Sequence, residues 1–142
     1  MLTKETPDHH DAELVLRLYE LRRDPMMREA RETIATKFAP KSAEDVLAVT
    51  ARSHPLNAAF RQVSSYWEMV YGMARYGIIH PDFLMENCGE GLLLYAKVHP
   101  YLEEFRSHGY PRGFRNAEWV AENSQVGREV FARFQQRLKQ AT

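Results

Sequence analysis

A polar stripe runs through an otherwise apolar segment of the sequence. Its members stand three or four residues apart, and they are Arg61, Ser65, Glu68, Gly72 and Arg75. This spacing places them along one side of a helix. Glu68 has the apolar neighbours Trp67 and Met69, so its carboxyl group is a candidate for partial burial and a raised pKa. Active sites use carboxylates in that state.

Two interpretations of Glu68 stay open on the sequence. In the first, a small ligand or substrate binds around Glu68, with Arg61, Arg75 and Tyr66 as its partners. In the second, Glu68 pairs with Arg61 or Arg75 on the exposed edge of the helix, or with an arginine of another helix. The stripe does not supply a base, a nucleophile and an oxyanion donor together. We therefore name ligand-binding candidates but no catalytic residue.

Histidine and cysteine spacing favours neither a metal site nor a cofactor. His10 and Glu13 stand three residues apart and His99 and Glu103 four apart, but a metal site in a helical bundle needs further carboxylates from other helices. The only cysteine, Cys88, lies on an apolar helical row, where a free thiol usually packs as a small hydrophobe. We predict no metal and no cofactor.

Composition argues against a nucleic-acid or membrane partner. Nineteen basic residues balance nineteen acidic ones, so the chain has no net charge to attract a polyanion. The segment 110–115 combines aromatics with two arginines, but it is too short to form a sustained basic face. Nucleic acid is an unlikely partner on this pattern. A content of 44% hydrophobic and 27% charged residues is that of a soluble globular domain.

The location expected from the sequence is the cytoplasm. A lone cysteine cannot form an internal disulfide, which fits a reducing compartment. Residues 1–10 carry charges of both signs without an apolar stretch, so no secretion signal is recognisable. No run of eighteen apolar residues exists, and we expect no membrane span.

A long central helix is predicted over residues 56–77. Its main apolar row has alternating spacings of four and three, and consists of Leu56, Phe60, Val63, Trp67, Val70 and Ala74. A second apolar row lies beside it, made of Ala59, Tyr66, Met69, Met73 and Tyr76. The combined apolar surface is wider than a surface helix needs, so neighbouring helices should cover it.

Shorter helices are predicted on both sides of this segment. One ends near Arg23, a second begins at Asp24-Pro25 and ends near Phe38, and a third follows Ser42. After Gly77, a helix starts at 80–82, with a break at 87–91 and a bend near 99, and Asn116 is the predicted N-cap of a last helix. We predict an all-α fold, a single-domain bundle of about five to seven helices over residues 1–142.

Two segments resemble a known family. Residues 18–31 (LYELRRDPMMREAR) and 63–79 (VSSYWEMVYGMARYGII) are similar to a family of small bacterial all-helical proteins classed as a domain of unknown function. In that family, an early Asp-Pro helix start is followed by an aromatic, a glutamate and a helix that ends in glycine. The resemblance implies an all-helical fold and carries no activity, ligand or catalytic residue.

The function predicted first is protein interaction without catalysis, most simply as a homodimer. The reason is the second apolar row, because Tyr66, Met69, Met73 and Tyr76 are more than one small bundle is expected to bury. The alternative is a small-ligand sensor or an enzyme with its site around Glu68. A cavity at Glu68 that holds a second titratable group in hydrogen-bond reach would favour the alternative.

Overall fold

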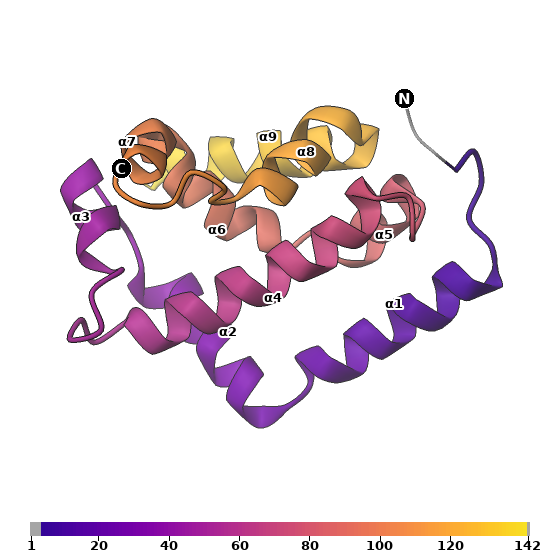
Figure 1. Ribbon diagram of the computed structural model, residues 1–142, viewed down its shortest axis with the longest axis horizontal. Coiled ribbons are helices and arrows are strands. Elements are labelled where there is room, and N and C mark those ends of the chain that lie inside the picture. Colours follow the sequence, from indigo (N-terminus) through magenta and orange to yellow (C-terminus); the bar gives the residue numbers. More distant parts are fainter. Residues whose placement is uncertain (1–3, 142) are drawn as a thin grey trace.

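The computed structural model describes residues 4–141, which form nine α-helices, one short 3-10 helix and no strand (Figure 1). The predicted all-helical fold is confirmed. The helices are α1 (His9–Arg22), α2 (Pro25–Lys37), α3 (Ala43–Ala48), α4 (Asn57–Arg75), α5 (Pro81–Asn87), α6 (Gly91–Val98), the 3-10 helix η1 (His99–Tyr101), α7 (Leu102–Ser107), α8 (Arg115–Asn123) and α9 (Gln125–Gln140).

Local capping explains where several helices begin and end. The Asp24 carboxylate accepts hydrogen bonds from the amides of Met26 and Met27 at 3.1 and 3.2 Å, and Pro25 occupies the first turn of α2. The Ser42 hydroxyl caps α3 in the same way. Gly77, just after α4, has a φ of 76°, the left-handed conformation that glycine adopts most easily. These boundaries follow the predicted ones closely.

Helix α4 lies at the centre of the fold, and it packs mainly against α8 on one side and α2 on the other. Its predicted main row is covered: Phe60 and Trp67 are 5% and 3% exposed. The second row is covered only in part, because Met69 and Tyr76 remain 47% and 64% exposed. Within the described residues, the buried apolar side chains form a single core cluster, and one domain over 1–142 stays a prediction.

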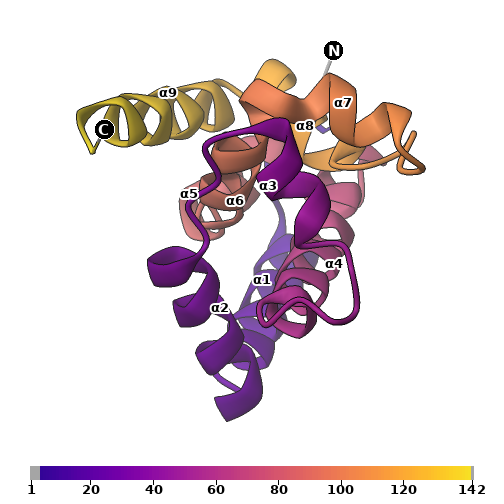
Figure 2. The ribbon, with the colours of Figure 1, turned by 90° about the vertical axis from the view of Figure 1, so that its left-hand side faces the viewer.

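The last helical segment differs from the prediction. Asn116 does not cap it, because Phe114 is the N-cap residue and Asn116 lies inside α8. A break at Ser124 then separates α8 from α9. The Ser124 hydroxyl donates to the Asp82 carboxylate at 2.6 Å and accepts from the Gly127 amide at 2.9 Å. Figure 2 shows α9 extending outward past α5 and α6. The extra breaks raise the helix number above the predicted five to seven.

A buried lysine closes the end of α2. Lys97 on α6 is 8% exposed, and its ammonium donates to the carbonyl oxygens of Ile34 and Ala35 at 2.9 and 3.0 Å. These carbonyls belong to the last turns of α2, where backbone acceptors lack partners inside the helix. Burial lowers the pKa of the Lys97 ammonium. The contact joins α2 to α6.

None of the helices in residues 4–141 is both long enough and apolar enough to cross a bilayer.

Position 91, at the start of α6, has no room for a side chain. A β-carbon on Gly91 would lie 2.5 Å from ring carbons of Trp67 and 2.6 Å from the Tyr71 hydroxyl oxygen, and all three residues are buried. We predict that Gly91→Ala lowers the free energy of unfolding by about 1–3 kcal/mol, the usual cost of overpacking a core. Urea denaturation followed by circular dichroism measures it.

A matched substitution separates packing from helix propensity. Ala132→Gly changes an exposed position of α9, where only propensity acts, and should cost about 1 kcal/mol. If Gly91→Ala were as stable as the wild type or more so, the proposed close packing of α6 on α4 would be wrong.

Candidate functional site

The Glu68 carboxylate accepts hydrogen bonds from the first free backbone amides of α8. Its two carboxylate oxygens accept hydrogen bonds from the backbone amides of Asn116 and Ala117, at 3.0 and 2.8 Å. The first amides of a helix have no partner within it, and they favour a negative charge nearby. The Asn116 side chain completes the contact, because it donates to the Glu68 carbonyl at 2.9 Å and accepts from Arg75 at 3.1 Å.

The predicted pairing of Glu68 with Arg61 or Arg75 is therefore wrong, since the Glu68 carboxylate binds backbone amides of α8 in place of an arginine. Burial raises the pKa of the Glu68 carboxyl. The two amide hydrogen bonds, and then the positive charges of Arg106 and Arg75, counteract that rise only in part. No second titratable side chain hydrogen-bonds to Glu68 within residues 4–141, so no acid–base pair is present there.

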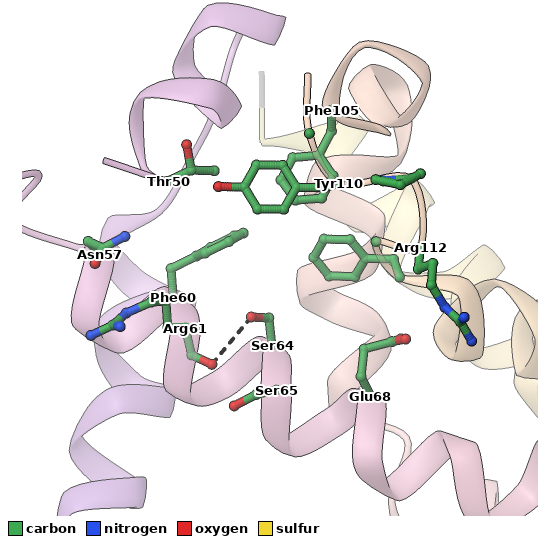
Figure 3. A pocket seen from close by; sticks show the side chains of 14 residues that line it. Thr50, Asn57, Phe60, Arg61, Ser64, Ser65, Glu68, Phe105, Tyr110 and Arg112 are labelled. Carbon is green, nitrogen blue, oxygen red and sulfur yellow. Dashed lines mark hydrogen bonds between the residues drawn. The ribbon is translucent and has the colours of Figure 1, made fainter. Parts of the chain in front are cut away.

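An open hollow lies beside Glu68, and we call it the aromatic hollow (Figure 3). Its volume is about 540 Å³, within the usual range for small-molecule sites. Its aromatic lining comes from α4, α7 and the loop 109–114, and consists of Phe60, Phe105, Tyr110 and Phe114. The polar lining includes Arg61, Ser64, Ser65, Glu68 and Arg112.

The loop of the aromatic hollow contains a strained residue. Phe114 has a φ of 59°, a left-handed conformation that is rare for a bulky side chain. Its buried ring packs between Phe60 and Phe105, with centroids 6.4 and 5.6 Å away. Tyr110 stacks on the Phe105 ring at 4.6 Å and is 40% exposed at the opening. Aromatic packing thus holds this loop against α4.

The four predicted ligand-binding residues do not share one site. Glu68 and Arg61 both line the aromatic hollow. Arg75 does not line the hollow, and its guanidinium donates a hydrogen bond to the Asn116 side chain. Tyr66 lies on another side of α4, where its hydroxyl donates to the Leu18 carbonyl of α1 at 2.7 Å. Burial raises the pKa of Tyr66 to about 12. Ligand binding by these residues stays a prediction.

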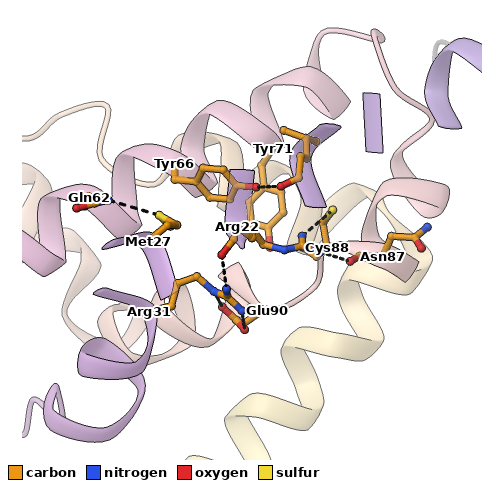
Figure 4. A network of polar contacts seen from close by, with 10 residues as sticks. Arg22, Met27, Arg31, Gln62, Tyr66, Tyr71, Asn87, Cys88 and Glu90 are labelled. Atoms are coloured by element: carbon orange, nitrogen blue, oxygen red, sulfur yellow. Dashed lines mark hydrogen bonds and ion pairs between the residues drawn. The ribbon is translucent and has the colours of Figure 1, made fainter. Parts of the chain in front are cut away.

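A second hollow, which we call the arginine hollow, is lined by Arg22, Arg31, Cys88 and Glu90, whose polar contacts lie near Tyr66 in Figure 4. It has a volume of about 480 Å³. It lies where the end of α1 and the start of α2 meet the turn between α5 and α6. Its lining consists of Tyr19, Arg22, Arg23, Arg28, Arg31, Asn87, Cys88 and Glu90.

Two of these arginines are held in place. Arg22 donates to the Cys88 sulfur at 3.1 Å and to the Asn87 carbonyl at 3.4 Å. Arg31 forms a bidentate ion pair with Glu90, with both N···O distances at 2.7 Å, and donates to the Arg22 carbonyl at 3.0 Å. Such paired contacts fix the plane of a guanidinium group.

A third space, the α2–α9 groove, adjoins the arginine hollow and shares Arg28, Arg31 and Glu90 with it. Its volume is about 590 Å³. Helices α2, α4, α6 and α9 contribute its lining, together with Glu90 before α6. The apolar lining is Ile34, Ala35, Val63, Trp67, Leu93, Leu94 and Phe134, and the charged lining is Arg28, Arg31, Glu32, Glu90 and Arg137.

The sequence prediction missed the arginine hollow. A signal existed, because four arginines fall within ten residues, at Arg22, Arg23, Arg28 and Arg31. The Asp-Pro helix start between them turns the chain and brings the end of α1 close to α2. Metal ligands do not gather anywhere in residues 4–141, since no three His, Cys, Asp or Glu side chains converge there.

Comparison with known proteins identifies the family. Residues 7–124 match the family described as a domain of unknown function (DUF4760). The chain belongs to this family. The predicted resemblance is thereby confirmed, and the DUF4760 match covers α1 to α8, including the whole lining of the arginine hollow. Helix α9, with Phe134 and Arg137 of the groove, follows the matched segment. No curated protein and no solved structure shows significant similarity to the chain.

Titration of Glu68 tests its environment. We predict a pKa above the ordinary value of 4.5, measured from the carboxyl carbon by NMR. A raised folded-state pKa means that the folded protein keeps a proton that the unfolded chain has released. Relative to Glu68→Gln, the wild type should therefore lose stability as the pH rises from below 4.5 through the folded-state pKa.

The Glu68→Gln variant also assigns the NMR signal, which must disappear from its spectrum. A Glu68 pKa at or below 4.5, or a stability difference that does not change across that interval, would contradict the prediction and show that the amides of Asn116 and Ala117 balance or outweigh the effect of burial.

Proposed function

We propose that this protein is a non-catalytic interaction module whose α2–α9 groove binds an acidic, amphipathic helix of another protein. The observation that carries the proposal is the groove itself, in which the accessible apolar residues Ala35, Leu93 and Phe134 lie beside three arginines and two glutamates. Helices commonly bind other proteins by placing an apolar face in such a groove.

The lining indicates the chemistry of the partner. Half-buried Leu93 and Phe134 and exposed Ala35 offer contacts for leucine-like side chains. Three arginines oppose two glutamates along the groove. An acidic face on the partner would complement this charge and accelerate association.

A second copy of the chain is the competing occupant. Self-association was predicted from four apolar residues of the second row, but Tyr66 and Met73 are half-buried in one molecule, and of the four only Met69 and Tyr76 are exposed. The lining of the groove has one more positive than negative charge and so favours a negatively charged partner, whereas this chain has no net negative charge. These facts favour another protein over a homodimer. A cytoplasmic location, suggested by the lone Cys88, belongs to the same proposal.

A designed peptide tests the groove directly. The probe is a labelled helical peptide with leucines on one face and glutamates on the other, measured by fluorescence anisotropy. We expect saturable binding that weakens with salt. The single variant Phe134→Ala and the double variant Arg28→Gln/Arg137→Gln should each lose about tenfold in affinity.

The matched control is Arg133→Gln, because Arg133 is an exposed arginine of α9 that does not line the groove. Its affinity should equal that of the wild type. Equal binding of a lysine version of the peptide, or no effect of the groove variants, would contradict the proposal. Sedimentation of the free protein as a concentration-dependent dimer would favour the second copy.

A small-ligand module is the second candidate, and the aromatic hollow is the observation that favours it. Arg61 and Arg112 stand at opposite edges of the hollow in Figure 3, and neither guanidinium makes a hydrogen bond or ion pair within residues 4–141. An aromatic molecule with one anionic group fits this combination, since its ring would face Phe105 and Tyr110.

Anilinonaphthalene sulfonate has this chemistry and serves as the probe. We expect its fluorescence to rise on binding, and its affinity to fall by about tenfold in Tyr110→Ala combined with Arg61→Gln. Tyr76→Ala is the control, because Tyr76 is an exposed tyrosine that follows α4 outside the hollow. A loss in the control equal to that in the double variant would exclude the hollow as the binding site.

A further inference from the structure

The arginine hollow has a surplus of positive charge. Four arginines line it and Glu90 is its only carboxylate, which leaves three positive charges on the lining. The chain as a whole has no net charge. Like charges gathered in this way repel one another, and a bound anion would relieve that repulsion.

The free donors of the hollow are identifiable. Arg23 contacts only the Tyr19 ring, with its guanidinium carbon 5.7 Å from the ring centroid, and Arg28 makes no side-chain hydrogen bond or ion pair within the described part of the chain. Both side chains are exposed. They therefore keep all their N–H donors available for a ligand.

The other two arginines are preorganised. Arg22 lies between two rings, 5.6 Å from the Tyr19 centroid and 5.5 Å from the Trp67 centroid, and also donates to Cys88 and to the carbonyl of Asn87. Arg31 is fixed by Glu90. Groups already held in place lose less conformational entropy when a ligand arrives.

The thiol of the hollow does not cancel this charge. Cys88 is 1% exposed, and its burial raises the pKa of the thiol despite the hydrogen bond from Arg22. The sulfur therefore stays a neutral thiol at neutral pH. The arginines keep their full positive surplus, and Cys88 is not an activated nucleophile.

We propose that the arginine hollow binds the phosphate group of a phosphomonoester. Guanidinium forks match the geometry of phosphate oxygens, and a dianion offsets most of the surplus charge. The hollow, at about 480 Å³, also has room for part of the molecule that carries the phosphate. This site is additional to the α2–α9 groove, with which it shares Arg28, Arg31 and Glu90, and it does not require the acidic helix proposed there.

Calorimetric titration at low ionic strength tests the site with inorganic phosphate and O-phosphoserine. We expect each to bind once per chain, with serine and chloride inactive. Arg23→Gln and Arg28→Gln should each weaken binding by about tenfold. Both side chains are exposed, and Arg23 contacts only the exposed Tyr19 ring, so both variants should fold, as circular dichroism will show.

Two controls keep this result separate from the groove. Arg17→Gln changes an exposed arginine of α1 outside the hollow, and Arg137→Gln changes the groove alone. Both should bind O-phosphoserine as the wild type does, while Arg23→Gln should still bind the acidic peptide. Amide shifts on adding O-phosphoserine should concentrate at 22–31 and 87–90.

The source of the phosphate follows from a third ligand, a phosphoserine peptide. Stronger binding of that peptide than of O-phosphoserine would support a phosphorylated side chain as the ligand, and equal binding would support a small ester. Absence of binding by phosphate and O-phosphoserine, or affinities unchanged in Arg23→Gln and Arg28→Gln, would overturn the proposal.

Discussion

The packing of the helices depends on side chains that hydrogen-bond to the free backbone groups at the ends of other helices. Glu68 of α4 accepts the first amides of α8, Asp82 of α5 accepts the Val126 amide and the Ser124 hydroxyl at the start of α9, and Lys97 of α6 donates to the last carbonyls of α2. An unpaired backbone group in the interior is costly, so each contact fixes one helix against another. The placement of α8 then determines the aromatic hollow, and the placement of α2 and α9 determines the groove.

Most of the helices could be predicted because their signals are local. The apolar row of α4 has helical spacing, and its members Phe60 and Trp67 are buried. Asp24 caps the start of α2, which follows it directly, and Gly77 lies just after the end of α4. Each of these features depends on residues a few positions apart, so the sequence alone contains the physical cause. Tyr71 shows the limit: it lies on neither predicted row, yet it is completely buried, with the start of α6 packed against its hydroxyl, which donates to the distant Cys88 carbonyl.

The candidate sites were less predictable because distant segments build them. Glu68 was correctly singled out as a carboxylate in an apolar helix, but its partners lie forty-eight and forty-nine residues away and are backbone amides, which no pattern of side chains reveals. Asn116 has the right type for an N-cap, yet Phe114 takes that position through aromatic packing. The four arginines of the hollow lie within ten residues of one another in the sequence. Cys88 and Glu90 lie far from them in the sequence, and only the tertiary fold brings them together.

The ion pair between Arg31 and Glu90 stands in the wall that separates the arginine hollow from the groove, and both residues face both spaces. An anion that drew the Arg31 guanidinium toward itself would uncover the Glu90 carboxylate on the groove side. That change would repel an acidic helix and so make the two occupants antagonists. Thermodynamic linkage makes this effect reciprocal: a helix seated in the groove would lower the affinity of the hollow by the same factor, which would turn two adjacent surfaces into one negatively cooperative switch.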